Sequence, residues 1–325
     1  MSPTLLDLGL VAVGLVVLTA GADLLVRGAG ALALRVGLSP LVVGLTVVAF
    51  GTSSPELAVS VEAAVIGNSA IALGNVVGSN LFNITLILGI TALIRTMTVD
   101  RALVRRDLPV MLGATVLPLL MLLDGVVGRL DGAILVAGLI GYTAFNIRAS
   151  RREAKASASE MTDDMRAAAE AVRKPLWWSL GLLAVGLVAL VVGAGWLLDG
   201  AVGLATDFGV PAAVIGLTLV AAGTSLPELA TSVVAARKGE PEIALGNVVG
   251  SNTFNVLGVL GVAALVHPVE QGGVTWPTLG AMLTASVVAF GLLAWRGHLG
   301  RAEGAALVLA YVVYTAVLVA TTPIG

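Results

Sequence analysis

The chain has 325 residues, of which 58% are hydrophobic and only 12% are charged. A soluble domain of this size carries about 25% charged residues, so a soluble globular protein is excluded. The net charge of −2 carries little information for a chain that lies mostly in lipid. Cysteine is absent and only two histidines occur, His267 and His298, which excludes disulfide and thiolate chemistry and disfavours an imidazole metal site. Any buried cation site must therefore be built from oxygen ligands, which suit hard ions such as Na⁺, Ca²⁺ or Mg²⁺.

Ten apolar segments are each long enough to cross about 30 Å of hydrocarbon, so we expect an all-α polytopic membrane protein. In chain order they are 4–25, 41–66, 70–94, 108–124, 131–148, 176–198, 211–236, 242–266, 276–295 and 304–322. The first segment has no basic region before it and no small-residue cleavage site, so it is expected to be retained as a span. The polar segment 149–175 is expected to be a solvated linker between two halves, 1–148 and 176–325, with room for a short surface helix. The alternative for this segment is a regulatory element.

Lysine and arginine are distributed unevenly among the connections between spans. Of 18 such residues, 17 follow odd-numbered spans, and Arg129 alone lies on the other face. The positive-inside rule therefore predicts that the odd-numbered connections, including 149–175, are cytoplasmic and that both termini lie outside. The expected location is the cell (inner) membrane.

The second span carries a polar sequence, GTSSPE, at its centre. Thr52 and Ser53 lie four and three residues before Glu56, so all three can share one helix face. Pro55 lacks the N–H that would bond a carbonyl one turn earlier, so the carbonyls from Ala49 to Thr52 are expected to be freed. A carboxylate at a helix centre costs about 3 kcal/mol to insert, and free carbonyls in a bilayer need a polar cavity or a partner. A bound cation satisfies both requirements.

The third span carries a second polar sequence, GNVVGSNLFN, over residues 74–83. Ser79 and Asn83 are four residues apart and share a face, and the glycines allow neighbouring helices to approach closely. For any single Ser, Thr or Asn, a hydrogen bond across helices is the simplest explanation, and Asn75 is left outside the predicted site for this reason. Glu62 lies near the outer end of the second span and is expected at the surface.

Both polar sequences occur twice in the chain. Residues 44–90 and 216–262 align without a gap at a constant offset of 172, with 31 of 47 positions identical. The counterparts of the residues above are Ala221, Thr224, Ser225, Glu228, Ser251 and Asn255, and Asn247 is left out like Asn75. Five spans separate equivalent points, so we expect two inverted five-helix repeats. Such repeats are typical of secondary transporters, whose substrate site lies between the copies near the midplane.

Together the two copies offer two carboxylates, several hydroxyls, two asparagines and backbone carbonyls, and Ca²⁺ binds six to eight oxygens. One Ca²⁺ or a few Na⁺ ions could be held here. The alternatives are a duplicated scaffold, protonated and hydrogen-bonded glutamates, a channel, or an intramembrane hydrolase that uses Ser53 or Ser225. The hydrolase needs a base beside the serine, and neither a histidine nor a lysine lies in the membrane-embedded part of the repeats. We therefore expect no enzymatic activity.

These residues resemble the two α-repeats of the sodium/calcium exchanger family, within the cation/calcium antiporter superfamily. GTSSPE and GTSLPE match its G-T-S-x-P-E signature, and the sequences at 74–83 and 246–255 match its G-N-x-x-G-S-N signature. The resemblance implies a prokaryotic type without regulatory domains, because 149–175 is too short to hold them. It also implies that spans one and six slide as a gating bundle across the core.

The resemblance implies a role for each matched residue. Glu56 and Glu228 would be the shared ligands of a central Ca²⁺ site, completed by the carbonyls of Thr52 and Thr224. The flanking Na⁺ sites would use Ala49, Ser53 and Ser251 on one side and Ala221, Ser225 and Ser79 on the other, with Asn83 and Asn255 facing the centre.

Two departures from relatives bear on the coupling ion. Several relatives, including potassium-dependent ones, carry Asp at the position of Asn255, and proton-coupled relatives tend to carry an acid at the positions of Gly78 and Gly250. The sequence therefore favours a K⁺-independent, electrogenic antiporter that exchanges Na⁺ for Ca²⁺ by alternating access. The alternative is a Ca²⁺/H⁺ antiporter that uses the same two glutamates. No cofactor is expected, since Ca²⁺ and Na⁺ are cargo, and the expected partner is the lipid bilayer, with no nucleic acid and no obligatory protein partner.

Overall fold

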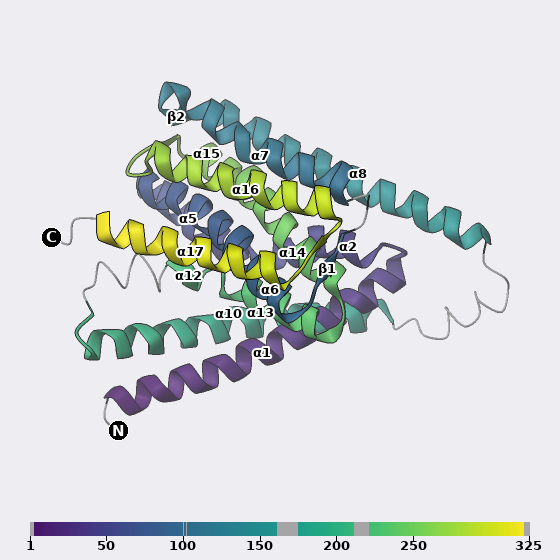
Figure 1. The fold of residues 1–325 in the computed structure, drawn as a ribbon, viewed down its shortest axis with the longest axis horizontal. Helices are drawn as coiled ribbons and strands as arrows, with labels where there is room; N and C mark the ends of the chain where they lie inside the picture. The colour runs from purple at the N-terminus through teal and green to yellow at the C-terminus, as the bar shows by residue number, and fades with distance from the viewer. Residues whose placement is uncertain (1–2, 100, 102, 161–174, 211–220, 322–325) are drawn as a thin grey trace.

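Helices make up nearly the whole of the computed structural model, which describes residues 3–99, 101, 103–160, 175–210 and 221–321 (Figure 1). The first half contains α1 (Pro3–Val36), α2 (Pro40–Val43), the π-helix η1 (Gly44–Val48), α3 (Ala49–Thr52), α4 (Ser54–Val65), α5 (Ser69–Leu81), η2 (Phe82–Ile87), α6 (Leu88–Ile94), η3 (Leu103–Asp107), α7 (Leu108–Met121), η4 (Leu122–Asp124) and α8 (Arg129–Glu160). The second half contains α10 (Leu176–Asp207), α12 (Ala221–Gly223), α13 (Leu226–Lys238), α14 (Pro241–Phe254), η6 (Asn255–Leu260), α15 (Gly261–Val266), α16 (Trp276–Arg296) and α17 (Arg301–Thr321). The short strands are β1 (Met97–Thr98), β2 (Val126–Val127), β3 (Val269–Glu270) and β4 (His298–Leu299).

Nine membrane-length segments occur among the described residues, and each coincides with a segment expected from hydropathy. Eight are continuous helical stretches, and the ninth is the bent pair Pro40–Thr52 and Ser54–Val65. The chain is therefore a helical membrane protein. The tenth expected segment, 211–236, begins in residues outside the described part, and its remainder forms α12 and α13.

Three helices extend well past the ends that hydropathy predicts, and one of them is α10, which continues from the expected end at residue 198 to Asp207. The first span is predicted to end at residue 25, but α1 continues to Val36 and ends before Gly37, whose φ of 66° is left-handed. α8 runs to Glu160, so the first part of the expected linker 149–175 continues this helix, and the later part lies outside the described residues. Charged residues end the apolar stretch that lipid requires. They do not end a helix, because Arg, Lys and Glu are good helix formers.

α1 and α10 lie side by side along one edge of the molecule, with their backbones in contact (Figure 1). A Cβ atom added at Gly21 would lie 2.7 Å from the Leu190 nitrogen, and one added at Gly193 would lie 2.4 Å from the Leu18 nitrogen. The glycines of this contact recur every seven residues, as Gly14, Gly21 and Gly28 on α1 and Gly186, Gly193 and Gly200 on α10. We call this contact the glycine seam. It brings the two helices as close together as small residues allow in a membrane.

Two short ribbons join the halves at opposite ends of α7 (Figure 1). β1 pairs antiparallel with β4, where Met97 faces Leu299, and β2 pairs antiparallel with β3, where Val127 faces Val269. At the repeat offset of 172, Met97 corresponds to Val269 and Val127 corresponds to Leu299. Each ribbon is therefore the other with the halves exchanged, which is the pattern that a twofold axis between the halves produces.

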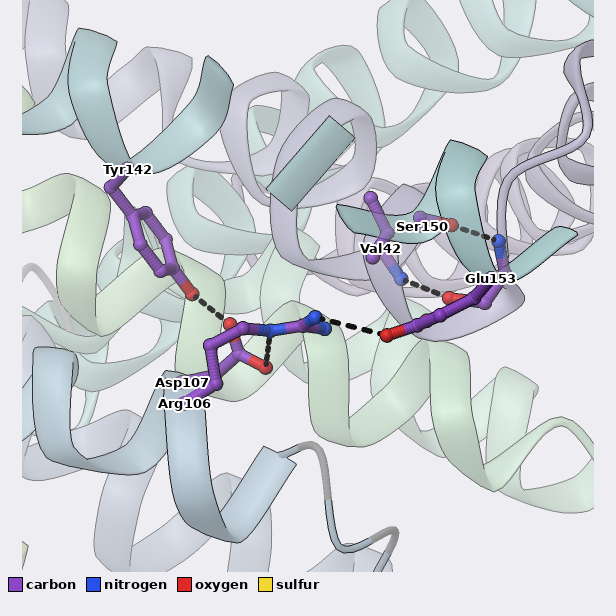
Figure 2. Close-up of polar contacts among 7 residues, drawn as sticks. Val42, Arg106, Asp107, Tyr142, Ser150 and Glu153 are labelled. Carbon is purple, nitrogen blue, oxygen red and sulfur yellow. Dashed lines mark hydrogen bonds and ion pairs between the residues drawn. The ribbon is translucent and has the colours of Figure 1, made fainter. Parts of the chain in front are cut away.

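A buried polar cluster fastens η3, the turn that leads into α7, to α8 outside the repeated motifs (Figure 2). The Tyr142 hydroxyl donates to Asp107 Oδ1 at 3.0 Å, and Arg106 Nε lies 3.5 Å from Asp107 Oδ2. Further along α8, the Ser150 hydroxyl accepts the amide of Ser39, whose own hydroxyl caps α2. The cluster and this cap therefore hold the starts of α7 and α2 against the same helix, α8.

Candidate ion-binding site

The sequence GTSSPE breaks the second span into two helices. α3 ends at Thr52, α4 begins at Ser54, and the two parts of the span meet at an angle of 46°. Ser53, between them, has φ −85° and ψ 9°, and its counterpart Ser225 has φ −90° and ψ 7°. The same turn therefore forms in both copies, as their nearly identical sequences predict.

Pro55 and Pro227 lie in the first turn of the helix after each break, rather than inside a continuous helix. A proline is tolerated there because the first N–H groups of a helix have no partner within it. The expectation that proline frees the Ala49 carbonyl is wrong. That carbonyl accepts the Ser53 amide at 3.0 Å and the Thr52 hydroxyl at 3.4 Å. In the second copy, Ala221 is the first residue of α12.

The two copies exchange hydrogen bonds across these breaks. The Ser53 hydroxyl donates to Glu228 Oε1 at 2.8 Å, and the Ser225 hydroxyl donates to Glu56 Oε1 at 3.0 Å. All four side chains are fully buried. Each glutamate is thus held by the serine of the other copy, and both lie at an interface between the copies rather than facing lipid.

Several side-chain oxygens of the motifs are buried without a hydrogen-bond partner among the described residues. They form repeat-related pairs: Glu56 Oε2 and Glu228 Oε2, Ser79 Oγ and Ser251 Oγ, and Asn83 Oδ1 and Asn255 Oδ1. A buried polar atom without a partner costs about 1–3 kcal/mol, and more when it is charged. Six such oxygens on the four motif segments indicate a binding site for a ligand that is coordinated by oxygen atoms.

The negative charge of this region comes from the two glutamates. Within the described part of the chain, no ion pair involves Glu56 or Glu228. No group of three or more His, Cys, Asp or Glu side chains forms there either. The arrangement therefore offers two negative charges among neutral oxygens, which suits one divalent cation or a few monovalent ones.

Two features of this region were not expected from the motifs. The first is a π-helix that begins shortly after each G-S-N sequence, η2 from Phe82 in the first copy and η6 from Asn255 in the second. π-helices are rare, and those that occur often lie at functional sites. The second is a chain of amides: Asn255 Nδ2 donates to Asn80 Oδ1 at 3.1 Å, and Asn80 Nδ2 donates to the Asn252 carbonyl at 3.3 Å. The signal that could have found Asn80 and Asn252 is their identity in both copies.

A family model described as sodium/calcium exchanger protein matches residues 6–148 and 178–320. The chain belongs to the sodium/calcium exchanger protein family. The two matched segments are separated by the repeat offset of 172 at both ends. The match to the exchanger family therefore skips the whole of the expected linker, 149–175, and divides the chain into two matched segments of equal length.

This member of the exchanger family has relatives along its whole length. It is 37% identical, over 329 aligned positions, to the inner membrane protein YrbG of Escherichia coli, covering 98% of this chain and 99% of the relative. It is 33% identical, over 336 aligned positions, to the sodium/calcium exchanger MaX1 of Methanosarcina acetivorans, covering 94% and 96%. Its fold is similar to that of the sodium-calcium exchanger NCX_Mj soaked with zero Na⁺ and Ca²⁺, with a TM-score of 0.82 and 31% identity over 97% of this chain and 99% of that one.

Proposed function

We propose that this protein is a secondary active antiporter that exchanges Na⁺ for Ca²⁺ across the membrane by alternating access. The observation that carries the proposal is the crossed pair of buried glutamates. Each accepts a hydrogen bond from a serine of the other copy, and each keeps one oxygen without a partner among the described residues. The similarity of the chain to the exchangers MaX1 and NCX_Mj supports the same cargo.

In this proposal the two copies share one central Ca²⁺ site and hold Na⁺ ions on either side of it. The central ligands are the carboxylates of Glu56 and Glu228 and the carbonyls of Thr52 and Thr224. The flanking ligands are Ala49, Ser53 and Ser251 on one side and Ala221, Ser225 and Ser79 on the other, with Asn83 and Asn255 facing the centre. Because Ca²⁺ and Na⁺ use overlapping oxygens, only one kind of cargo is held at a time, and this competition produces antiport.

We further propose that 1–148 and 176–325 are inverted five-helix repeats, giving ten spans joined by a cytoplasmic connection at 149–175. The exchanged pairing of the two ribbons at opposite ends of α7 supports a twofold axis in the membrane plane. Both termini then lie outside, and the similarity to an inner membrane protein of Escherichia coli supports the same membrane. Inverted repeats allow alternating access because each copy can adopt the conformation of the other. The glycine seam supports movement of α1 and α10 as one bundle.

Charge balance supports electrogenic exchange without K⁺. Two carboxylates neutralise one Ca²⁺, whereas three Na⁺ ions leave a charge of +1, so an inside-negative potential favours Na⁺ entry by about 2.3 kcal/mol per charge per 100 mV. Asn83 and Asn255 add hydrogen-bonding oxygens to the site but no charge. An additional K⁺ would therefore lack a carboxylate to balance it.

Counterflow in proteoliposomes tests the proposal. Uptake of ⁴⁵Ca²⁺ is measured while gradients of Na⁺, K⁺ and H⁺ are imposed one at a time. A Na⁺ gradient should drive uptake in the absence of K⁺, and the rate should respond to membrane potential. Uptake driven by a pH gradient without Na⁺ would instead establish a Ca²⁺/H⁺ antiporter that uses the same glutamates.

Replacing the carboxylates tests the site itself. Glu56→Gln and Glu228→Gln each remove one of the two charges, and each should abolish Na⁺-driven uptake because one carboxylate cannot balance Ca²⁺. Glu62→Gln is the matched control, since Glu62 lies on the same helix as Glu56 but is exposed. Uptake that survives replacement of either buried glutamate would remove that residue from the site.

A further inference from the structure

Two asparagines outside the predicted ligand set each join segments of both copies. Asn75 Nδ2 donates to the Glu56 carbonyl at 3.0 Å and to the Ser60 hydroxyl at 2.9 Å, and both acceptors lie on α4 of its own copy. Asn75 Oδ1 accepts the hydroxyl of Thr224, which belongs to the other copy, at 3.4 Å. One amide group therefore contacts two helix turns from different halves of the chain. We call the turn that holds Glu56 or Glu228 the glutamate turn, and the turn that holds Thr52 or Thr224 the threonine turn.

Asn247 makes the same three contacts with the copies exchanged. Its Nδ2 donates to the Glu228 carbonyl at 3.3 Å and to the Ser232 hydroxyl at 3.0 Å, and its Oδ1 accepts the Thr52 hydroxyl at 3.1 Å. Asn247 is fully buried, whereas Asn75 is half-buried. Because the contacts occur twice in crossed form, they are a property of the repeat and not of the packing around one helix.

We propose that Asn75 and Asn247 are positioning residues for ion binding, each of which fixes the threonine turn of one copy against the glutamate turn of the other. The inference rests on the proposed function, in which Glu56, Glu228 and the threonine carbonyls hold cargo. A planar amide with both ends bonded sets the spacing between the two turns. The carboxylate of one copy and the carbonyl of the other are then kept at a distance that one ion can bridge.

Positioning has a consequence that differs from direct ligation. Neither asparagine supplies a ligand or a charge to the cargo, so its removal leaves the composition of the site intact. What is lost is the pre-organisation of ligands that come from separate helices, and binding weakens when ligands must be ordered by the ion itself. The half-saturating concentrations of both Ca²⁺ and Na⁺ should therefore rise together.

The crossed contacts provide matched controls for double-mutant cycles. Asn75 contacts Thr224, so Asn75→Ala and Thr224→Val form a contacting pair. Asn247 contacts Thr52, so Asn247→Ala and Thr52→Val form the second contacting pair. The same four substitutions can also be combined within one copy. This gives two non-contacting pairs of identical chemistry, Asn75→Ala with Thr52→Val and Asn247→Ala with Thr224→Val. Valine keeps the shape and the backbone carbonyl of threonine and puts a methyl group in place of the hydroxyl.

The measurements are equilibrium binding of ⁴⁵Ca²⁺, the half-saturating Ca²⁺ and Na⁺ concentrations for uptake, and thermal unfolding without ions. Each single substitution should raise the half-saturating concentrations by about fivefold. In a contacting pair the second substitution should add little, whereas in a non-contacting pair the two effects should multiply. Effects that multiply in all four pairs, or losses of binding that follow the unfolding temperature, would overturn the inference.

The result also separates failure of this inference from failure of the proposed function. Absence of Ca²⁺ binding by the unaltered protein would refute the function itself. Normal binding that Glu56→Gln abolishes, with no difference between the two kinds of pair, would refute only the role of the asparagines. If an alanine variant does not fold, the single variants Thr52→Val and Thr224→Val decide the question, because unchanged half-saturating concentrations in both would refute the role as well.

Discussion

Adding one methyl group at the glycine seam should destabilise the protein, and the structure indicates by how much. In Gly193→Ala the new Cβ would lie 2.4 Å from the Leu18 nitrogen, 2.8 Å from the Leu18 Cα and 3.0 Å from the Gly14 carbonyl oxygen. All three are backbone atoms, so no side-chain rotation relieves the overlap. Since non-bonded carbon contacts lie at about 3.5–4.0 Å, α1 and α10 must separate by about 1 Å.

A separation of this size has a definite cost. A gap of about 0.5–1 Å forfeits a quarter to a half of each dispersion contact along the seam. Overpacking of this kind typically costs about 1–3 kcal/mol of unfolding free energy. Gly195→Ala is the matched control because it lies on the same helix and nothing comes within 4 Å of its added Cβ. There, the better helix propensity of alanine should leave the stability unchanged or raise it by up to about 1 kcal/mol.

Thermal unfolding in detergent, followed by tryptophan fluorescence, measures both variants. Gly193→Ala should unfold about 2–12 °C below the unaltered protein, since each kcal/mol shifts the midpoint of a large domain by about 2–4 °C. Gly195→Ala should unfold at or above the temperature of the unaltered protein. Equal unfolding temperatures for the two variants would refute backbone contact between α1 and α10 as the source of stability.

Two further predictions concern polar contacts. Ser53→Ala leaves a buried Glu228 oxygen without its donor and should raise the half-saturating Ca²⁺ concentration about tenfold. Ser54→Ala should have no effect, because that hydroxyl bonds a carbonyl of its own span, and equal effects of the two substitutions would contradict the crossed contact. Tyr142→Phe removes the hydroxyl that donates to buried Asp107 and should lower the unfolding free energy by about 1–3 kcal/mol without changing the half-saturating Ca²⁺ concentration. Weaker Ca²⁺ binding with unchanged stability would contradict a purely structural role for that cluster.

Hydropathy located the membrane segments because lipid imposes both a minimum length and an apolar composition on any helix that crosses it. It did not locate the helix ends. α1 continues through Arg27 and Arg35 to the left-handed Gly37, and α8 continues to Glu160. Helix ends depend on backbone conformation and capping, which an average over apolar residues does not measure.

The repeat predicted most of the candidate site, because acids buried in lipid are costly and two at equivalent positions need a common explanation. It did not predict the details of the break. Pro55 lies in the first turn of a new helix, and the Ala49 carbonyl accepts the Ser53 amide. It also left out Asn75 and its counterpart, since one asparagine in a membrane helix has a simpler explanation in a hydrogen bond between helices.

By itself, the sequence determined which segments are long and apolar enough to cross a membrane and that two acidic turns recur at equivalent points, because both follow from composition and spacing along one chain. Only the tertiary structure decided that each glutamate accepts a hydrogen bond from a serine of the other copy, with the two partners 169 and 175 residues apart in the chain. It alone decided that α1 and α10 touch through their backbones. The physical reason is that such contacts depend on which faces of distant helices meet, and that choice leaves no local pattern in either segment.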